Sequence, residues 1–164
     1  LGICNGFQAL IKSGLLPHGK ITDLTENDLT LYRNDSYTHV STTALTRVAN
    51  TNSPWTQDFD VNTVHEVVFS HGEGKLAGND VEKYKNLAAF QYCDFDGNAS
   101  LNGKHNPNGS CYAIEGLISE DGLILGKMGH SERYAENLYK TNTVKGKQDI
   151  FKNGVNYFKQ GTLC

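Results

Sequence analysis

Residues 1–17, LGICNGFQALIKSGLLP, decide the fold expected for this chain. Residues 2–6 have the form G-x-C-x-G, in which small residues flank a nucleophile because a sharp strand-to-helix turn brings two stretches of backbone close together. Apolar side chains at helical spacing follow the turn, and a glycine and a proline then stop the pattern. The stretch therefore predicts the end of a strand at 1–3, a turn at the cysteine and a helix over about 6–13.

Cys4 is the candidate nucleophile of this turn. A cysteine at a helix N-terminus lies near backbone N–H groups and the positive end of the helix dipole, which favour the reactive thiolate. The backbone N–H of Asn5 is then placed to bind the oxyanion that forms when the thiolate attacks a carbonyl. The motif alone leaves open a second interpretation, in which Cys4 is a small buried hydrophobic residue beside a glycine turn.

A candidate base follows a strand-like stretch near residue 130. Residues i and i+2 of an extended segment share one side, so Glu132 can accept a hydrogen bond from His130 and leave the other ring nitrogen facing the thiol. Taken alone, the same residues would fit a surface histidine followed by a helix whose first turn carries a glutamate. The combination with the cysteine turn favours a catalytic pair.

The rest of the chain predicts short strands and helices without repeats or linkers. Irregular strands or a hairpin are expected over 20–48, where threonine, aspartate and asparagine are frequent. Further strands are expected over 67–69, 88–95, 111–118 and 123–128. Helices are expected over 80–88, over 132–140 with Ser131 as the N-cap, and over 147–158, where the pattern is amphipathic.

Composition limits the classes of function. The chain has 164 residues, a net charge of −3 and a pI near 6.1, which predicts one domain without the basic field that nucleic acid requires. No apolar run is long enough for a membrane span and no leader resembles a signal peptide, so a soluble, cytoplasmic protein is expected. The four cysteines lie far apart with no C-x-x-C pair, which predicts reduced thiols.

Two tempting motifs lack the required spacing. His65 and His71 are six residues apart rather than the four of H-E-x-x-H, so no metal site is expected. The stretch GEGKLAG, at 72–78, lacks the spacing of a phosphate-binding loop and has no following serine or threonine. We therefore expect neither metal nor ATP in this domain.

Several motifs in order carry a family resemblance that covers essentially the whole chain. GICNGFQ, SHGEGK, NPNGS and GKMGHSER resemble the class I glutamine amidotransferase domain of phosphoribosylformylglycinamidine synthase, particularly its large single-chain form. SHGEG, NPNGS and the closing DIFKNGVNYF are the specific parts, whereas the cysteine turn is shared more broadly. The resemblance implies an α/β domain of the flavodoxin-like three-layer type, with a mainly parallel sheet in the intact family. Residues 1–164 would be its C-terminal portion, incomplete at the N-terminus.

The resemblance also implies a reaction. A triad of Cys4, His130 and Glu132 would hydrolyse L-glutamine through a glutamyl thioester. The ammonia would pass to the synthetase region of the same enzyme, which uses ATP and magnesium and is absent from this sequence. The substrate would be contacted by Gln8, Ser70, His71 and Glu73.

Two departures from the family pattern matter. Many class I relatives read P-H-P-E where this chain has G-H-S-E at 129–132, but the histidine and glutamate keep their positions. The chain also begins without the preceding strands and the glycine-containing loop that supplies a second oxyanion donor. Two alternatives remain at this stage, a catalytically silent docking or regulatory module and a different class I amidotransferase. SHGEG and NPNGS argue against the latter.

Overall fold

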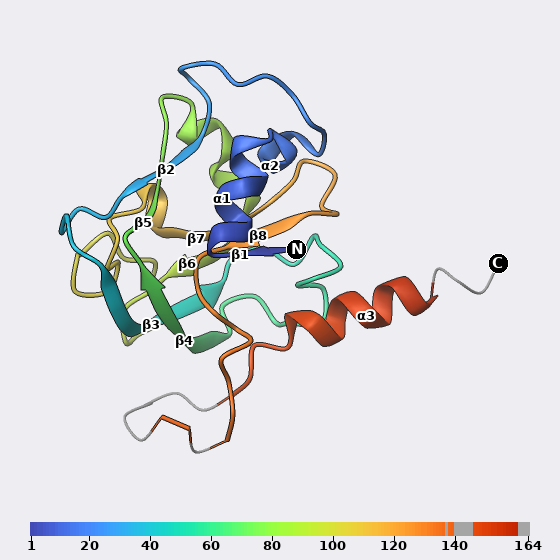
Figure 1. Cartoon of the computed structure of the whole chain (residues 1–164). Helices are drawn as coiled ribbons and strands as arrows, with labels where there is room; N and C mark the ends of the chain where they lie inside the picture. Colours follow the sequence, from blue (N-terminus) through green and yellow to red (C-terminus); the bar gives the residue numbers. More distant parts are fainter. Residues whose placement is uncertain (137, 140–145, 161–164) are drawn as a thin grey trace.

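A six-stranded sheet forms the centre of the computed structural model, which describes residues 1–136, 138–139 and 146–160 (Figure 1). Only the neighbours β1 and β8 are parallel, and every other pairing in this sheet is antiparallel. An isolated bridge between Val68 and His130 joins the last strand to the residues that follow β8, so the sheet curls back on itself. In spatial order the strands are β1 (Gly2–Ile3), β8 (Leu125–Lys127), β7 (Ile114–Ile118), β6 (Ala88–Tyr92), β3 (Val40–Val48) and β4 (Val64–His71).

Two short helices cover one side of β1 and β8. Helices α1 (Asn5–Lys12) and α2 (Leu15–His18) follow the cysteine turn directly. Phe7 and Ile11, four residues apart on one face of α1, are fully buried against the sheet. A Cβ atom on Gly126 would lie 2.2 Å from the Phe7 ring, so only glycine lets α1 approach β8 this closely. This contact fixes the helix that begins just after Cys4.

A second, two-stranded antiparallel sheet lies beside the first. It consists of β2 (Thr30–Arg33) and β5 (Glu73–Ala77), and β4 turns into β5 at Gly72. Burial alternates along β4, as a strand with one interior face requires. Two 3₁₀ helices, η1 (Val81–Leu87) and η2 (Cys111–Ala113), complete this part of the chain.

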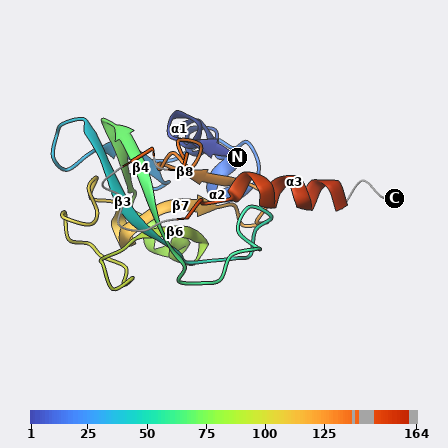
Figure 2. The same ribbon diagram turned by 90° about the horizontal axis from the view of Figure 1, so that it is seen from below.

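The C-terminal helix α3 (Ile150–Gln160) packs most closely at its beginning, and the ring of Phe158 near its end lies 6.1 Å from that of Trp55. Ile150, Asn153 and Gly154 are buried, and Gly154 lies against the ring of Trp55. Farther along, Val155 and Phe158 are about half exposed, and the helix extends away from the body (Figures 1 and 2). None of the helices in the described residues is long and apolar enough to cross a membrane.

The α/β fold class is confirmed, with two corrections. The described residues between 132 and 139 form turns and bends instead of the predicted helix, because the Ser131 side chain turns inward to Gln148 and does not cap a helix. Residues 137 and 140 of that prediction lie outside the described residues. The mainly parallel sheet expected of the intact family is represented in this chain by the β1–β8 pair alone, and antiparallel hairpins supply most of the remaining pairings.

Candidate active site

Cys4 occupies the sharp turn that its flanking glycines predict. Its backbone has φ 53° and ψ −107°, a conformation that residues other than glycine rarely adopt and that occurs at functional sites. Its N–H donates to Lys127 O at 2.8 Å, and its carbonyl accepts from the N–H of Gln8 at 3.1 Å. A Cβ atom on Gly2 would lie 2.6 Å from the backbone of Gly6, so the turn closes only with glycine there.

His130 is oriented by Glu132, as the spacing of two residues predicts. Nδ1 of His130 lies 2.5 Å from Oε1 of Glu132. The carboxylate accepts the proton of Nδ1, which leaves Nε2 as the ring nitrogen with a free lone pair. Nε2 is buried and makes no hydrogen bond to the residues that the structure describes. The imidazole therefore has the tautomer of a general base.

Strand β4 brings the cysteine and the histidine to one edge. The Cys4 sulfur lies 3.9 Å from the carbonyl oxygen of Ser70. The backbone N–H of His130 donates to the carbonyl of Val68 at 2.8 Å. Carbonyls two residues apart on a strand point the same way and are about 7 Å apart. Cys4 and His130 therefore contact neighbouring carbonyls on the same edge of β4, although 126 positions separate them in the sequence.

The charge state of Cys4 corrects the sequence-based expectation. Partial burial raises the pKa of the Cys4 thiol above its ordinary value, and this is the largest influence on it. The backbone N–H of Asn5 and the charge of Arg133 act in the opposite direction, while Glu132 raises the pKa further. The helix N-terminus does favour the thiolate through Asn5, but burial outweighs it. The raised pKa favours the thiol over the thiolate.

The four predicted substrate-binding residues come from α1, β4 and β5, and they do not all lie on the side of Cys4. Gln8 donates from Nε2 to the carbonyl of Glu73 at 2.8 Å, and Ser70 Oγ lies 3.1 Å from His39 Nε2. The ring of His71 instead points into the interior, because consecutive strand residues face opposite ways. Its Nδ1 lies 3.1 Å from the side-chain oxygen of Asn34. Gln8, Ser70 and Glu73 thus connect to the cysteine side, and His71 does not.

The NPNGS motif has a structural use that its sequence did not indicate. Asn108 is fully buried and donates to the carbonyl of Gly74 and to the hydroxyl of Tyr92, both at 2.8 Å. Ser110 accepts the N–H of Leu76 at 3.0 Å. The motif therefore holds the start of β5, which is the continuation of the SHGEG loop.

Sequence reasoning missed three charged residues near the site. Arg133 follows the histidine segment, and its charge acts on the Cys4 thiol. Lys127 and Glu115 form an ion pair in which both side chains are completely buried. The signal for this pair was a charged residue at the end of the otherwise apolar stretch LILGKM, at 123–128.

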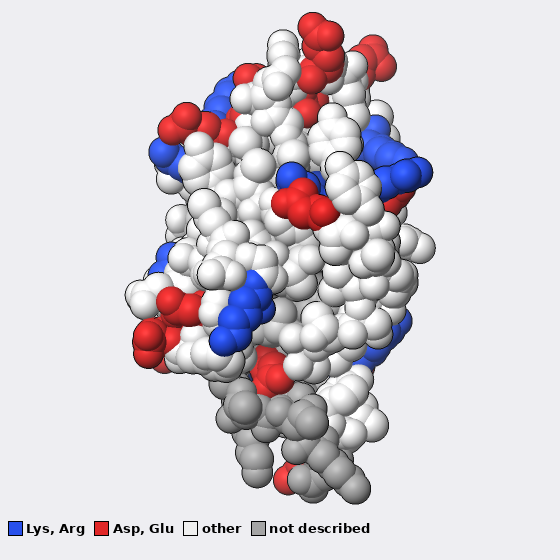
Figure 3. All heavy atoms as spheres, turned by 90° about the vertical axis from the view of Figure 1, so that its left-hand side faces the viewer, with Lys and Arg blue, Asp and Glu red and all other residues white. Residues whose placement is uncertain are grey.

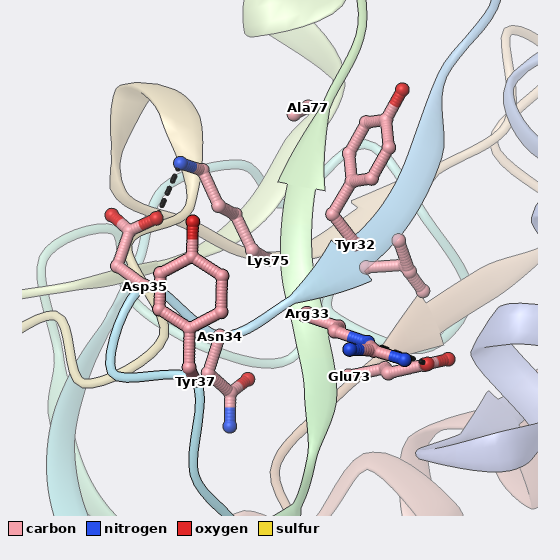
Figure 4. A pocket seen from close by; sticks show the side chains of 9 residues that line it. Tyr32, Arg33, Asn34, Asp35, Tyr37, Glu73, Lys75 and Ala77 are labelled. Atoms are coloured by element: carbon pink, nitrogen blue, oxygen red, sulfur yellow. Dashed lines mark hydrogen bonds and ion pairs between the residues drawn. The ribbon is translucent and has the colours of Figure 1, made fainter.

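A surface pocket of about 590 Å³ is lined by residues of the paired strands β2 and β5 and borders the SHGEG loop at Glu73. Figure 4 shows Lys75 directed at Asp35, with 2.6 Å between Nζ and Oδ1, and Arg33 stacked beside Glu73.

On the face of the molecule shown in Figure 3, charged side chains are scattered among larger uncharged areas.

The described residues contain three cysteines, and none of them forms a disulfide. Cys4, Cys93 and Cys111 are free, and Cys164 lies outside the described residues. Among the residues whose positions are described, no group of three or more histidine, cysteine, aspartate or glutamate side chains is arranged to hold a metal ion.

Comparisons with protein families and with curated proteins identify the family of this chain. The model of the CobB/CobQ-like glutamine amidotransferase domain family matches residues 1–158. The chain belongs to this family. Among curated proteins, the chain is similar to the phosphoribosylformylglycinamidine synthase subunit PurQ of Pseudothermotoga lettingae, with 35% identity over 138 residues. It is also similar to PurQ of Acaryochloris marina, with 37% identity over 141 residues.

The matches cover unequal shares of the proteins compared. The match to PurQ of Pseudothermotoga lettingae covers 84% of this chain and 53% of that protein. The match to PurQ of Acaryochloris marina covers 83% of this chain and 54% of that protein, so the chain spans about half the length of these relatives. The solved structure of PurLQS from Thermotoga maritima matches with a TM-score of 0.68 and 25% identity. That match covers 96% of this chain and 60% of the other.

Proposed function

We propose that this chain is the glutaminase part of a phosphoribosylformylglycinamidine synthase, which hydrolyses L-glutamine to supply ammonia for purine biosynthesis. The observation that carries the proposal is that Cys4, in its strained turn, and the His130–Glu132 pair lie against carbonyls two residues apart on one edge of β4. The family membership and the similarity to PurQ proteins support the same reaction.

The proposed reaction follows from the positions and hydrogen bonds of these groups. His130 Nε2 takes the proton of the Cys4 thiol as the sulfur attacks the side-chain amide carbon of glutamine. The N–H of Asn5 stabilises the oxyanion, and His130 then gives its proton to the departing ammonia. A water molecule, deprotonated by His130, attacks the thioester and releases glutamate and the thiol. Glu132 holds the imidazole in the required tautomer and stabilises its charged form.

The substrate and partners complete the proposal. Contacts to glutamine are assigned to Gln8, and contacts around its amino-acid end to the loop that carries Ser70, His71 and Glu73. His71 acts from the far face of β4, through the position of the loop that it anchors to Asn34. The ammonia passes to a synthetase region of the same enzyme, which takes the ATP and magnesium. The working location is the cytoplasm.

The extent of the domain is part of the same proposal. Residues 1–164 form one glutamine amidotransferase domain that is incomplete at its N-terminus, as in the large single-chain form of the synthase. The chain spans about half the length of each PurQ relative. A preceding loop would then supply a second oxyanion donor. Such a donor contributes about 10²–10³ in rate.

Replacement of each cysteine tests the assignment of the nucleophile. Glutamate release from glutamine is measured in the full-length protein for Cys4→Ala, Cys93→Ala and Cys111→Ala. Cys4→Ala abolishes the activity, while the other two variants keep it within a few fold, because their sulfurs lie outside the turn. Equal losses in all three would refute Cys4 as the nucleophile and favour a silent docking module.

A further inference from the structure

A buried ion pair lies directly beneath the candidate site. Lys127 on β8 and Glu115 on β7 have no exposed side-chain surface, and Nζ and Oε1 lie 3.3 Å apart. Burial of two charges costs free energy that their mutual attraction seldom repays, so such a pair is weak support for stability by itself. The contacts of the two side chains indicate a more specific use.

The pair holds the backbone on both sides of the catalytic histidine. Lys127 Nζ donates to the carbonyl of Gly129 at 2.9 Å and to the hydroxyl of Ser131 at 3.0 Å. Glu115 Oε1 accepts the N–H of Gly129 at 2.6 Å. Both backbone polar groups of the residue before His130, and the side chain of the residue after it, are therefore bound to one ion pair.

The local sequence explains why this support is needed. Glycine has the largest conformational freedom of any residue, so Gly129 does not restrict the path of the backbone into His130. A larger residue has no room there, because a Cβ atom would lie 2.8 Å from the side chains of Phe69 and Val67. The backbone must therefore be fixed by contacts from outside the segment. Ser131 extends them through its bond to Gln148 Oε1 at 2.6 Å.

We propose that Lys127 and Glu115 are positioning residues that set the place of the His130 imidazole relative to Cys4. The inference rests on the proposed glutaminase function, in which His130 moves each proton. A misplacement of about 1 Å in a reacting group can lower a rate by about 10²-fold. Loss of the pair therefore acts on the chemical step more than on substrate binding.

The test removes both charges together in the full-length protein. A single replacement would leave one buried charge without a partner, whereas Lys127→Met with Glu115→Leu substitutes an apolar pair of similar size that folds without that penalty. We expect a lowered denaturation midpoint, because the N–H and carbonyl of Gly129 lose their partners, together with a KM within a few fold and a kcat about 10²-fold lower. The low-field proton resonance of His130 Nδ1–H, which reports its bond to Glu132, shifts or broadens.

A matched control makes the same chemical change elsewhere. Lys85 and Glu82 form an exposed ion pair at 3.3 Å on η1, and Lys85→Met with Glu82→Leu leaves kcat and the His130 resonance unchanged. Wild-type kcat and an unshifted resonance in the folded Lys127/Glu115 double variant would overturn the proposal.

Two further measurements cover the cases in which the double variant does not fold or the wild-type protein has no glutaminase activity. If the double variant does not fold, Ser131→Ala removes one contact of Lys127 Nζ while both charges stay paired. A lower kcat then supports the proposal and an unchanged kcat overturns it. A wild-type protein without glutaminase activity would refute the proposed function separately. The His130 resonance would still show whether the pair positions the ring.

Discussion

Two buried histidines predict a loss of stability in mild acid. His65 and His71 lie on the interior face of β4 and are only 5% and 4% exposed. Burial is the main reason that the pKa of each is lowered from 6.5 to about 4, with Lys127 adding to the effect at His65, and His39 and His130 at His71. The folded protein therefore keeps both rings neutral at a pH where the unfolded chain binds protons.

The size of the effect follows from the difference in pKa. Because the folded pKa is below the unfolded one, the stabilisation is complete above about pH 6.5 and is lost as the pH falls toward 4. Between pH 8 and pH 5, a histidine with these two values lowers the free energy of unfolding by about 2 kcal/mol. The two residues together account for about 4 kcal/mol, a large part of the stability of an ordinary domain.

Urea denaturation at pH 8 and pH 5 measures this loss, with His65→Leu as the comparison. Nδ1 of His65 makes no hydrogen bond to the described residues, and its ring packs on that of Phe59, so leucine removes the titration without breaking a known bond. The variant should lose about 2 kcal/mol less than the wild type over this interval. Equal losses in the two proteins, or a wild-type loss below about 1 kcal/mol, would refute the reasoning.

Two further predictions concern the site and its support. Asn108→Ala removes buried hydrogen bonds to Gly74 and Tyr92 and should lower the free energy of unfolding by about 1–3 kcal/mol in urea denaturation; an unchanged midpoint would contradict the structural use of NPNGS. Arg133→Gln should raise the pKa of Cys4, because the arginine charge lowers it, and should move the pH profile of iodoacetamide labelling upward. A profile that stays in place would exclude this influence of Arg133.

The local features of the site could be predicted from sequence, whereas its long-range contacts could not. The cysteine turn depends on glycines two residues away, and the His130–Glu132 bond joins residues two apart, so short motifs determine both. The Lys127–Glu115 pair depends on the register of β7 against β8, which local patterns do not define.

Two of the three corrections, the missing helix after His130 and the charge state of Cys4, have related physical causes. The stretch after His130 has residues typical of a helix, but the inward contact of Ser131 with Gln148 replaces the expected cap. The helix N-terminus does act on the Cys4 thiol, but burial, which depends on the whole fold, has the larger effect on its pKa. In both cases a tertiary contact outweighed a local preference.

The reaction of the cysteine with a glutamine analogue tests the central claim most directly. The chain, and a version extended at its N-terminus by the strands and glycine-containing loop expected of the family, would be exposed to 6-diazo-5-oxo-L-norleucine and analysed by intact-mass spectrometry with peptide mapping. The account predicts a single adduct on Cys4 in the extended version, absent from its Cys4→Ala variant. The absence of an adduct on Cys4 in both versions would contradict a glutaminase.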